Sequence, residues 1–213
     1  IIGGGVAGVT LAWQLIKKGH LVLLLDNKQN KSSTIAAGMI NPIVFRRVTK
    51  SWRVDEFLPF AIDFYKELEV ATGSQFFNSI KIRRFFASEQ EKKYWLRKQE
   101  EESYKKYLSP EENYKQEFTS TQNNLGSAIV KNAFRVNAQA FMQQTHKLFR
   151  TNNCLKHESF DYALFNRDKM MYNGEKYDSV VFCCGTEQDK VPYFNSIEIQ
   201  HTKGEILTVK AKQ

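Results

Sequence analysis

Three glycines near the start of the chain have the spacing of a phosphate-binding turn. They form the pattern Gly-x-Gly-x-x-Gly directly after an apolar segment. In such a turn the first glycine permits a sharp bend, the second lets a pyrophosphate approach the backbone, and the third lets a helix pack closely on a sheet. The helix N-terminus adds free N–H groups and partial positive charge. The residues expected to bind the pyrophosphate are Gly3, Gly5, Val6, Ala7 and Gly8.

An acidic residue completes the pattern at the expected distance. The sequence predicts a helix at about 9–18 and a strand over 21–25, which ends at Asp26. A carboxylate at this position accepts hydrogen bonds from ribose hydroxyls. Asp26 also disfavours a 2′-phosphate, which it would repel, although Lys28 partly offsets that repulsion. With the adjacent Asn27, these features indicate a dinucleotide-binding βαβ unit; the alternative is a glycine-rich turn in an unrelated α/β protein.

Composition sets broad limits on the fold and on the partners. The chain has 213 residues, of which 42% are hydrophobic and 25% charged, as in ordinary globular proteins. Its net charge is +8, from 31 Lys and Arg against 23 Asp and Glu. Many of these cations cluster at 46–53, 81–84, 92–98 and 103–106. An excess of basic residues suits an anionic cofactor, an acidic substrate or a nucleic acid. The alternative explanation is a basic surface that only contacts solvent.

Other kinds of site find little support in the sequence. Cys154, Cys183 and Cys184 form no C-x-x-C pair, and the four histidines lie at no ligand spacing, so we expect no metal site. The adjacent cysteines are interpreted as buried structural thiols in a reducing compartment. There is no serine-hydrolase elbow, no Walker lysine and no apolar run of ~18 residues that would span a membrane. We therefore expect a cytoplasmic protein.

The middle of the chain interrupts the βαβ pattern. Apolar residues recur at helical spacing over 52–72, with Pro59 inside as a possible start or kink, and Gly73 ends the helix. Strand character follows at 76–87, and Ser88 begins a helix. Residues 97–116, broken by Pro110, are interpreted as a solvated helix and a loop, and 117–126 as connecting structure. A strand then follows over 127–136. Residues 45–128 therefore indicate an inserted block of helices and antiparallel sheet.

The last third returns to α/β character. Asn137 is a predicted N-cap for a helix over 138–150, followed by a strand over 155–164. Asn173-Gly174 is a hairpin turn signal. Residues 178–186 form a continuous apolar run that ends near Gly185, and we expect a strand buried on both faces, as in a parallel sheet.

The glycine turn, together with the segment Ser33-Thr34-Ile35-Ala36-Ala37-Gly38-Met39, resembles a known family. It is similar to the flavin-dependent oxidoreductases of the D-amino-acid oxidase, glycine oxidase and sarcosine oxidase type. In that family a serine and an Ala-Ala-Gly segment follow the acidic residue along the FAD. The resemblance implies that Ser33 and Thr34 lie near the pyrophosphate and ribityl chain. It also implies that Ala37, Gly38 and Met39 lie close to the isoalloxazine ring.

The resemblance continues in the C-terminal half. It implies that Phe160 lies at the adenine, in place of a smaller valine, and that Cys184 and Gly185 lie close to the cofactor. Residues 201–207 are similar to a family segment that leads into the substrate domain, and family members continue well beyond this point. The implied fold is α/β, with a Rossmann-like (glutathione-reductase-like) FAD-binding domain, an interleaved antiparallel-sheet plus helix substrate domain, and the C-terminal part missing. The implied domains are 1–44 with 129–190 for FAD, and 45–128 with 191–213 for part of the substrate domain.

The resemblance implies an FAD-dependent oxidoreductase that oxidises the C–N bond of a small amine or amino acid by hydride transfer to flavin. The flavin performs this chemistry, so no catalytic side chain is named. One alternative is the FAD domain of a tRNA wobble-uridine modification enzyme, which the basic residues after Asn41-Pro42 would suit. Another is a non-catalytic NAD-binding module, which the βαβ unit alone permits.

Overall fold

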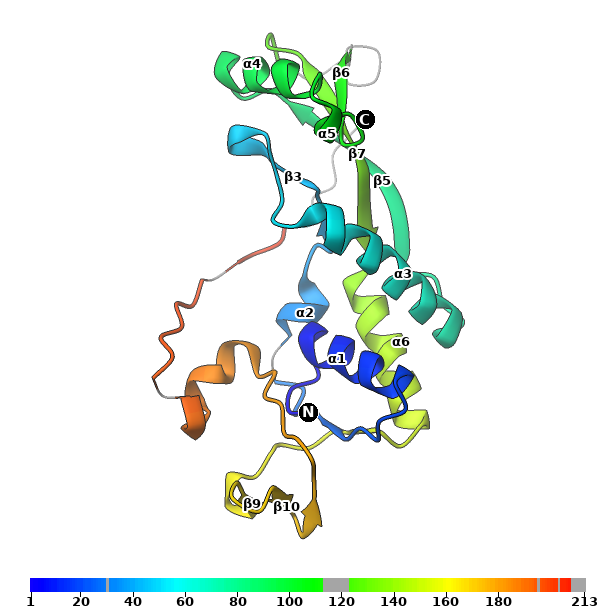
Figure 1. Cartoon of the computed structure of the whole chain (residues 1–213), viewed down its shortest axis with the longest axis vertical. Coiled ribbons are helices and arrows are strands. Elements are labelled where there is room, and N and C mark those ends of the chain that lie inside the picture. Colours follow the sequence, from blue (N-terminus) through cyan, green and yellow to red (C-terminus); the bar gives the residue numbers. More distant parts are fainter. Residues whose placement is uncertain (30, 113–122, 195, 203, 208–213) are drawn as a thin grey trace. The chain divides into compact units, whose positions relative to one another are not determined.

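The computed structural model describes residues 1–213 except 30, 113–122, 195, 203 and 208–213 (Figure 1). The chain folds into two compact units, which are described separately. The first comprises Ile1–Ala36 and the described part of Ala138–Gln213, and the second comprises Ala37–Asn137. In the described part of the chain, no helix is long and apolar enough to cross a membrane.

A small parallel sheet organises the first unit. β1 (Leu24–Leu25) pairs in parallel with β8 (Leu155–Lys156), with Leu25 opposite Lys156. On the other side of β1, Ile2 forms parallel bridges to both Leu25 and Phe182. The order 155, 24, 2, 182 is the parallel arrangement that a βαβ unit requires, since parallel neighbours need crossover connections. The strand ends carrying the glycine turn, Asp26 and Cys183 therefore lie at one edge.

Helices and a hairpin complete the first unit. α1 (Val6–Lys17) begins directly after Gly5, and α2 (Ser32–Ile35) contacts α6 (Ala138–Thr151). The remaining elements are η2 (Tyr162–Leu164), β9 (Phe165–Asn166), β10 (Met171–Tyr172), β11 (Glu175–Lys176), η3 (Gly185–Lys190) and η4 (Pro192–Phe194). β10 and β11 form the predicted hairpin: Asn173 and Gly174 have φ of 48° and 84°, as a type I′ turn requires.

Three predicted strands of this unit are shorter than the sequence indicated. Only Leu24–Leu25 of 21–25 is a strand, and Leu21 is fully exposed. Of 155–164, only Leu155–Lys156 pairs, because a 3-10 turn follows at Tyr162–Leu164. Residues 178–186 contribute a single bridge at Phe182, and Val181 is 37% exposed, so the prediction of a strand buried on both faces was wrong. Each strand ends where its neighbour in the sheet ends.

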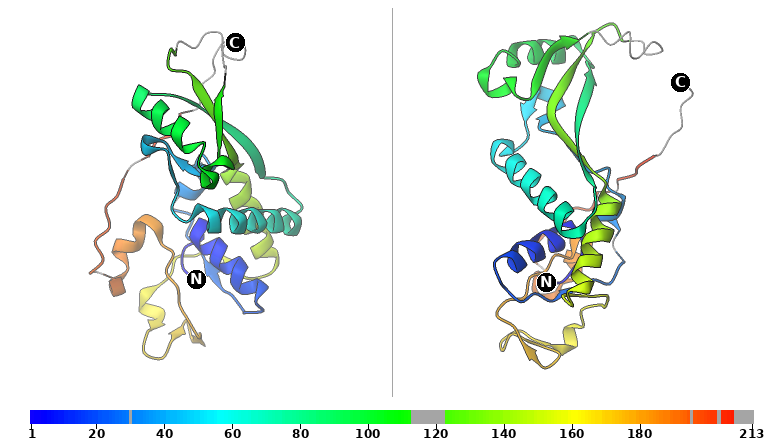
Figure 2. Two further views of the ribbon diagram at one scale, coloured as in Figure 1. Left: turned by 45° about the horizontal axis from the view of Figure 1, so that its top comes forward. Right: turned by 90° about the vertical axis from the view of Figure 1, so that its right-hand side faces the viewer.

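The second unit is built on an antiparallel sheet. β7 (Ser127–Val136) is its central strand and pairs with β2 (Met39–Ile40), β5 (Phe77–Phe85) and β6 (Leu108–Glu112). Figure 2 shows β5 and β7 as two long neighbouring strands. The other elements are β3 (Ile43–Val44), η1 (Phe45–Arg47), β4 (Thr49–Lys50), α3 (Val54–Thr72), α4 (Glu89–Lys98) and α5 (Glu102–Lys105).

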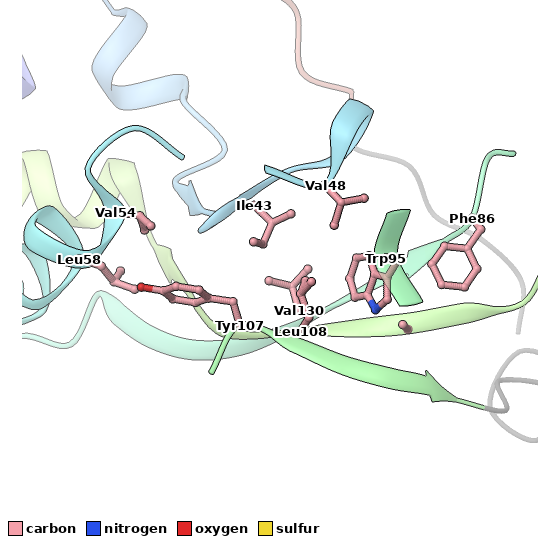
Figure 3. Close-up of a cluster of buried hydrophobic side chains, with 10 residues drawn as sticks. Ile43, Val48, Val54, Leu58, Phe86, Trp95, Tyr107, Leu108 and Val130 are labelled. Atoms are coloured by element: carbon pink, nitrogen blue, oxygen red, sulfur yellow. The ribbon is translucent and has the colours of Figure 1, made fainter. Parts of the chain in front are cut away.

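A hydrophobic core holds the helices of the second unit against this sheet (Figure 3). Trp95 of α4 is fully buried, contacts Phe86 edge to face at 5.7 Å between ring centroids, and donates its indole N–H to the Ser109 carbonyl at 2.8 Å. The predicted helix start at Ser88 is confirmed, and Ser88 is the N-cap of α4, because its hydroxyl accepts a hydrogen bond from the Glu91 N–H. The other core residues are Ile43, Val48, Val54, Leu58, Tyr107, Leu108, Ala128 and Val130.

Two local predictions for this unit differ from the structure. Pro59 does not start α3, which runs from Val54 to Thr72 with the proline inside it, and the helix lacks only the one hydrogen bond that the N–H of this residue would have donated. The predicted kink at Pro59 stays a prediction. The predicted loop around Pro110 is strand β6, whose pairing with β7 shifts register between Leu108 and Glu111. That irregularity accommodates the proline. Most of the predicted connection at 117–126 lies outside the described residues.

The architecture agrees with the α/β fold class that was predicted, with a parallel-sheet unit interleaved by an antiparallel block. The second unit begins at Ala37 and includes residues 129–137. The predicted domains placed residues 37–44 and 129–137 in the FAD-binding part instead. The described residues after 190 cluster with the first unit. The predicted domain boundaries themselves stay a prediction.

Candidate functional site

A cavity of the first unit lies along the edge where the parallel strands end. It has a volume of about 720 Å³, which falls within the range of small-molecule and cofactor sites. Its lining joins the glycine turn, the end of β1, α2 and the segment after Phe182. Ten of the predicted cofactor residues line it: Gly3, Gly5, Val6, Ala7, Asp26, Asn27, Ser33, Phe160, Cys184 and Gly185.

The glycine turn has room only for glycines. Gly3 has φ of +102°, and a Cβ there would lie 2.2 Å from the Cys183 carbonyl oxygen. A Cβ on Gly8 would lie 1.9 Å from the Gly3 oxygen, so Gly8 supports the turn from inside α1 and does not line the cavity. On the cavity side, a Cβ at Gly5 would come within 3.0 Å of the Ser33 hydroxyl. A backbone free of side chains at a helix N-terminus fits a pyrophosphate.

Asp26 lies directly against this turn. Its Oδ1 accepts a hydrogen bond from the Gly4 N–H at 3.4 Å, and its side chain is 15% exposed. Two histidines approach the other oxygen: His146 Nδ1 lies 4.0 Å and His157 Nδ1 3.9 Å from Asp26 Oδ2. Asn27 donates its amide to Glu187 Oε2 at 3.4 Å. The carboxylate predicted to hold ribose hydroxyls is therefore fixed at the cavity wall.

The predicted segment 33–39 divides between the two units. The Ser33 hydroxyl accepts a hydrogen bond from the Val6 N–H at 3.0 Å, which ties α2 to the glycine turn. Thr34 donates to the Lys31 carbonyl at 2.8 Å. It does not line the cavity but an adjoining groove, which shares Gly4, Gly5, Asp26 and Ser33 with it. Gly38 has φ of +68°, and a Cβ there would lie 1.9 Å from the Val136 oxygen. Ala37, Gly38 and Met39 belong to the second unit, and their place beside an isoalloxazine ring stays a prediction.

Aromatic rings form one wall of the cavity. Phe160 stacks on Tyr172 with 4.5 Å between ring centroids and contacts Phe182 edge to face at 5.7 Å. Tyr162 lies parallel to Phe182 at 6.4 Å. Flat aromatic faces suit a purine base, because every base has a π-face on which an aromatic side chain can stack. The larger side chain at position 160 thus joins an aromatic cluster.

Cys184 is half-buried at the same edge. Burial, together with the Cys183 thiol and the Glu187 carboxylate, raises the pKa of Cys184 to about 11. The Cys184 thiol lies 3.8 Å from the Ile2 carbonyl, and in the described chain all three cysteines are free thiols. These properties favour a structural thiol over a redox-active one, because the thiolate is the reactive form.

We expect Cys184 to resist alkylation. At pH 8 its thiolate fraction is about one in a thousand, whereas that of an ordinary thiol is roughly a quarter. Iodoacetamide labelling of Cys184 in a Cys154→Ser background, with the modified residue assigned from fragment ions in the mass spectrum, should be slow at pH 8. It should accelerate about tenfold per pH unit toward pH 11. Rapid labelling at pH 8 would show that the thiol is activated instead.

Sequence reasoning missed several residues of this site. It set aside His146 and His157 because they lack ligand spacing, and in the described chain no group of three or more His, Cys, Asp or Glu side chains could hold a metal. Their role in the site depends on the pairing of Leu25 with Lys156, which brings Asp26 beside His157. Parallel strand ends that meet at one edge are the signal that was available. Other cavity residues that were missed are Glu158, Tyr162, Phe182 and Glu187.

Comparisons with known proteins identify the family and the fold. The family described as "DAO: FAD dependent oxidoreductase" matches residues 1–213. Among solved structures, iminodiacetate oxidase from Chelativorans sp. BNC1 has 14% identity and a TM-score of 0.57 over 84% of this chain. Glycine oxidase from Geobacillus kaustophilus has 17% identity and a TM-score of 0.57 over 75%. L-Amino acid deaminase from Proteus myxofaciens has 14% identity and a TM-score of 0.55 over 73%.

These likenesses show the fold. The matched region covers 52% of the iminodiacetate oxidase chain, 46% of the glycine oxidase chain and 36% of the deaminase chain. The chain therefore spans about half the length, or less, of these solved structures. At such identities the fold is shared, and the chemistry has to be argued from the site.

Proposed function

Because the chain belongs to the DAO family of FAD dependent oxidoreductases, we propose that its protein oxidises the C–N bond of a small amine or amino acid. The observation that carries this proposal is the cavity of about 720 Å³ at the glycine turn, which Asp26 and several aromatic rings also line. A dinucleotide needs a bare turn, a ribose acceptor and a base surface, and this cavity supplies all three. The family match favours FAD over the NAD-binding alternative.

Each part of the cavity would bind one part of the cofactor. The backbone of residues 3–7, at the start of α1, would hold the pyrophosphate, and Ser33 would keep α2 against that turn through Val6. Asp26 would accept the ribose hydroxyls, with Asn27 beside it. Phe160 would stack on the adenine, and Cys184 with Gly185 would line the wall beyond the turn. Together these are the residues of the first unit that we propose to bind FAD.

The proposed reaction needs no protein side chain as an acid or a base. Bound FAD would supply the two-electron oxidation of the C–N bond, as the acceptor of a hydride from the carbon next to nitrogen, and the nitrogen would lose its proton to water. Water would hydrolyse the imine product to a carbonyl compound and an amine or ammonia, and dioxygen or another acceptor would take up the two electrons. The residues of this chain that line the cavity would bind and orient the dinucleotide.

The test is an anaerobic titration of the full-length protein. Glycine, sarcosine and D-amino acids are added in turn while the visible absorption is recorded. Bleaching of the flavin bands by one of them is the expected result and would identify the substrate class. Purified protein without flavin bands, and without flavin uptake when FAD is added, would overturn the proposal.

Flavin bands that no amine or amino acid bleaches would instead favour the tRNA-linked alternative. The observation behind that alternative is a pocket of about 640 Å³ in the second unit, lined by Arg46, Arg47 and Arg84 among others. Arg84 is engaged by Glu91 through hydrogen bonds of 2.6 and 2.9 Å, which leaves Arg46 and Arg47 as its main cationic groups. Binding of tRNA that weakens steeply with added salt would support this reading, since phosphate contacts release counterions.

A further inference from the structure

A histidine of α6 contacts the glycine turn. The Nε2 of His146, in α6, lies 2.7 Å from the Gly4 carbonyl oxygen, although the two residues are 142 positions apart. His146 lies on a second groove, of about 610 Å³, and is not among the residues lining the main cavity. We propose that His146 is a positioning residue, which orients the Gly4–Gly5 peptide so that its N–H faces the dinucleotide. This inference rests on the proposed binding of FAD at the turn.

The hydrogen bond assigns the tautomer of His146. A carbonyl oxygen only accepts hydrogen bonds, so Nε2 must carry the proton. The ring therefore donates to Gly4 whether it is neutral or charged. In the neutral ring Nδ1 has no proton, and it lies 4.0 Å from Asp26 Oδ2, beyond hydrogen-bond distance.

The planar peptide transmits this contact to the cavity. In a trans peptide the C=O and the N–H point in opposite directions, and the described chain has no cis peptide bond. A donor that holds the Gly4 oxygen toward α6 thus directs the Gly5 N–H to the opposite side. Gly5 lies directly before the first turn of α1 and lines the main cavity, as well as the groove beside His146. That N–H belongs to the set that a pyrophosphate requires.

The Gly3–Gly4 peptide is held less tightly than the Gly4–Gly5 peptide. Its N–H donates to Asp26 Oδ1 at 3.4 Å, a long hydrogen bond, whereas the His146 contact is 2.7 Å. Without His146, glycines in a turn of this kind have a wide range of backbone conformations. His146 therefore contributes the stronger restraint on the orientation of the turn.

A second histidine, His157, lies beside His146, and both approach Asp26. The His157 ring lies 5.9 Å away between centroids, and its buried Nδ1 has no hydrogen-bond partner. Burial, Lys28 and His146 lower the pKa of His157, while Asp26 opposes this shift and Arg150 adds to it. The lowered pKa favours the neutral ring of His157, and the hydrogen bond to the glycine turn comes from His146.

Three variants of the full-length protein test this assignment by FAD binding. His146→Ala removes the donor, and we expect the dissociation constant for FAD to rise about tenfold. His146→Gln keeps an N–H donor at similar reach, and we expect recovery to within about threefold of the wild-type value. Gln143→Ala, an exposed change on the same helix, should leave the constant unchanged. Affinities are compared below the melting temperature of each apoprotein, so that a loss of folding is not counted as a loss of binding.

The outcomes separate this inference from the proposed function. Wild-type protein that takes up no FAD would overturn both. FAD affinity equal in wild type and His146→Ala, or no recovery in His146→Gln, would overturn only the role of His146. A long-range ¹H–¹⁵N spectrum of the wild type at pH 8 gives a readout that needs no variant. It should show the Nε2–H tautomer for His146, and an Nδ1–H tautomer would contradict the assignment.

Discussion

Replacing Gly8 with valine should abolish the retention of FAD. A Cβ at this position would lie 1.9 Å from the Gly3 oxygen and 3.4 Å from a methyl carbon of Leu24, so the turn has to move away from α1. Overpacking of this kind costs about 1–3 kcal/mol or more. Imposed on the bound turn alone, that cost corresponds to roughly a 5- to 150-fold loss of affinity. The measurement is the ratio of flavin absorbance to protein after gel filtration of the full-length variant.

A matched control separates this steric effect from a general effect of valine. Gly204 is exposed, and a Cβ there would meet no atom within 4 Å. Gly204→Val should therefore retain the wild-type flavin content. A Gly8→Val protein saturated with FAD would show that the close approach of α1 to the turn is not needed for binding.

The second large effect concerns the core of the second unit. Trp95→Ala should lower the free energy of unfolding by about 3–5 kcal/mol, because the large cavity left by the indole is only partly filled by relaxation. Trp95 is fully buried between α4 and the sheet and contacts Phe86. Its removal also takes away the indole N–H that donates to the Ser109 carbonyl at 2.8 Å. Urea unfolding followed by circular dichroism measures this change.

Trp52 provides the control for the second prediction. Its exposed fraction is 76%, and its ring contacts Phe57 and the guanidinium of Arg53 at 5.4 Å each. Contacts of this exposed kind contribute about 0.5–1 kcal/mol. Trp52→Ala should thus shift the free energy of unfolding by no more than that. Equal losses in the two variants would contradict the buried position of Trp95.

Local chemistry accounts for much of what was predicted correctly. The glycine spacing and the following Asp26 predict a dinucleotide turn because each position has a steric or electrostatic requirement that few residue types meet. Asn173-Gly174 predicts its hairpin because a type I′ turn needs positive φ at both positions. Ser88 predicts the start of α4 because its side chain satisfies a backbone N–H of the first turn. Signals of this kind act within a few residues and can be read directly from the sequence.

Strand lengths and the Pro110 segment were not predictable in the same way. Residues 21–25 and 178–186 have strand composition, yet most of each segment lies outside the sheet, because a strand extends only as far as its neighbours pair with it. Pro110 has loop character by itself and lies in β6 because β7 offers a partner with an irregular register. Such pairing joins residues far apart in the chain, and sequence patterns within one segment do not contain it.

By itself, the sequence determined the type of ligand: a bare glycine turn at the start of a helix, followed by an acid, accommodates a dinucleotide, and Ser33–Met39 pointed to the flavin family. Only the tertiary structure decided what supports that turn. The parallel pairing of Leu25 with Lys156 sets His157 beside Asp26, and α6 brings His146 to the Gly4 oxygen from 142 residues away. The physical reason is range. Backbone sterics act between neighbours in the chain, whereas the hydrogen bonds and charges that orient the turn act between residues that only folding brings together.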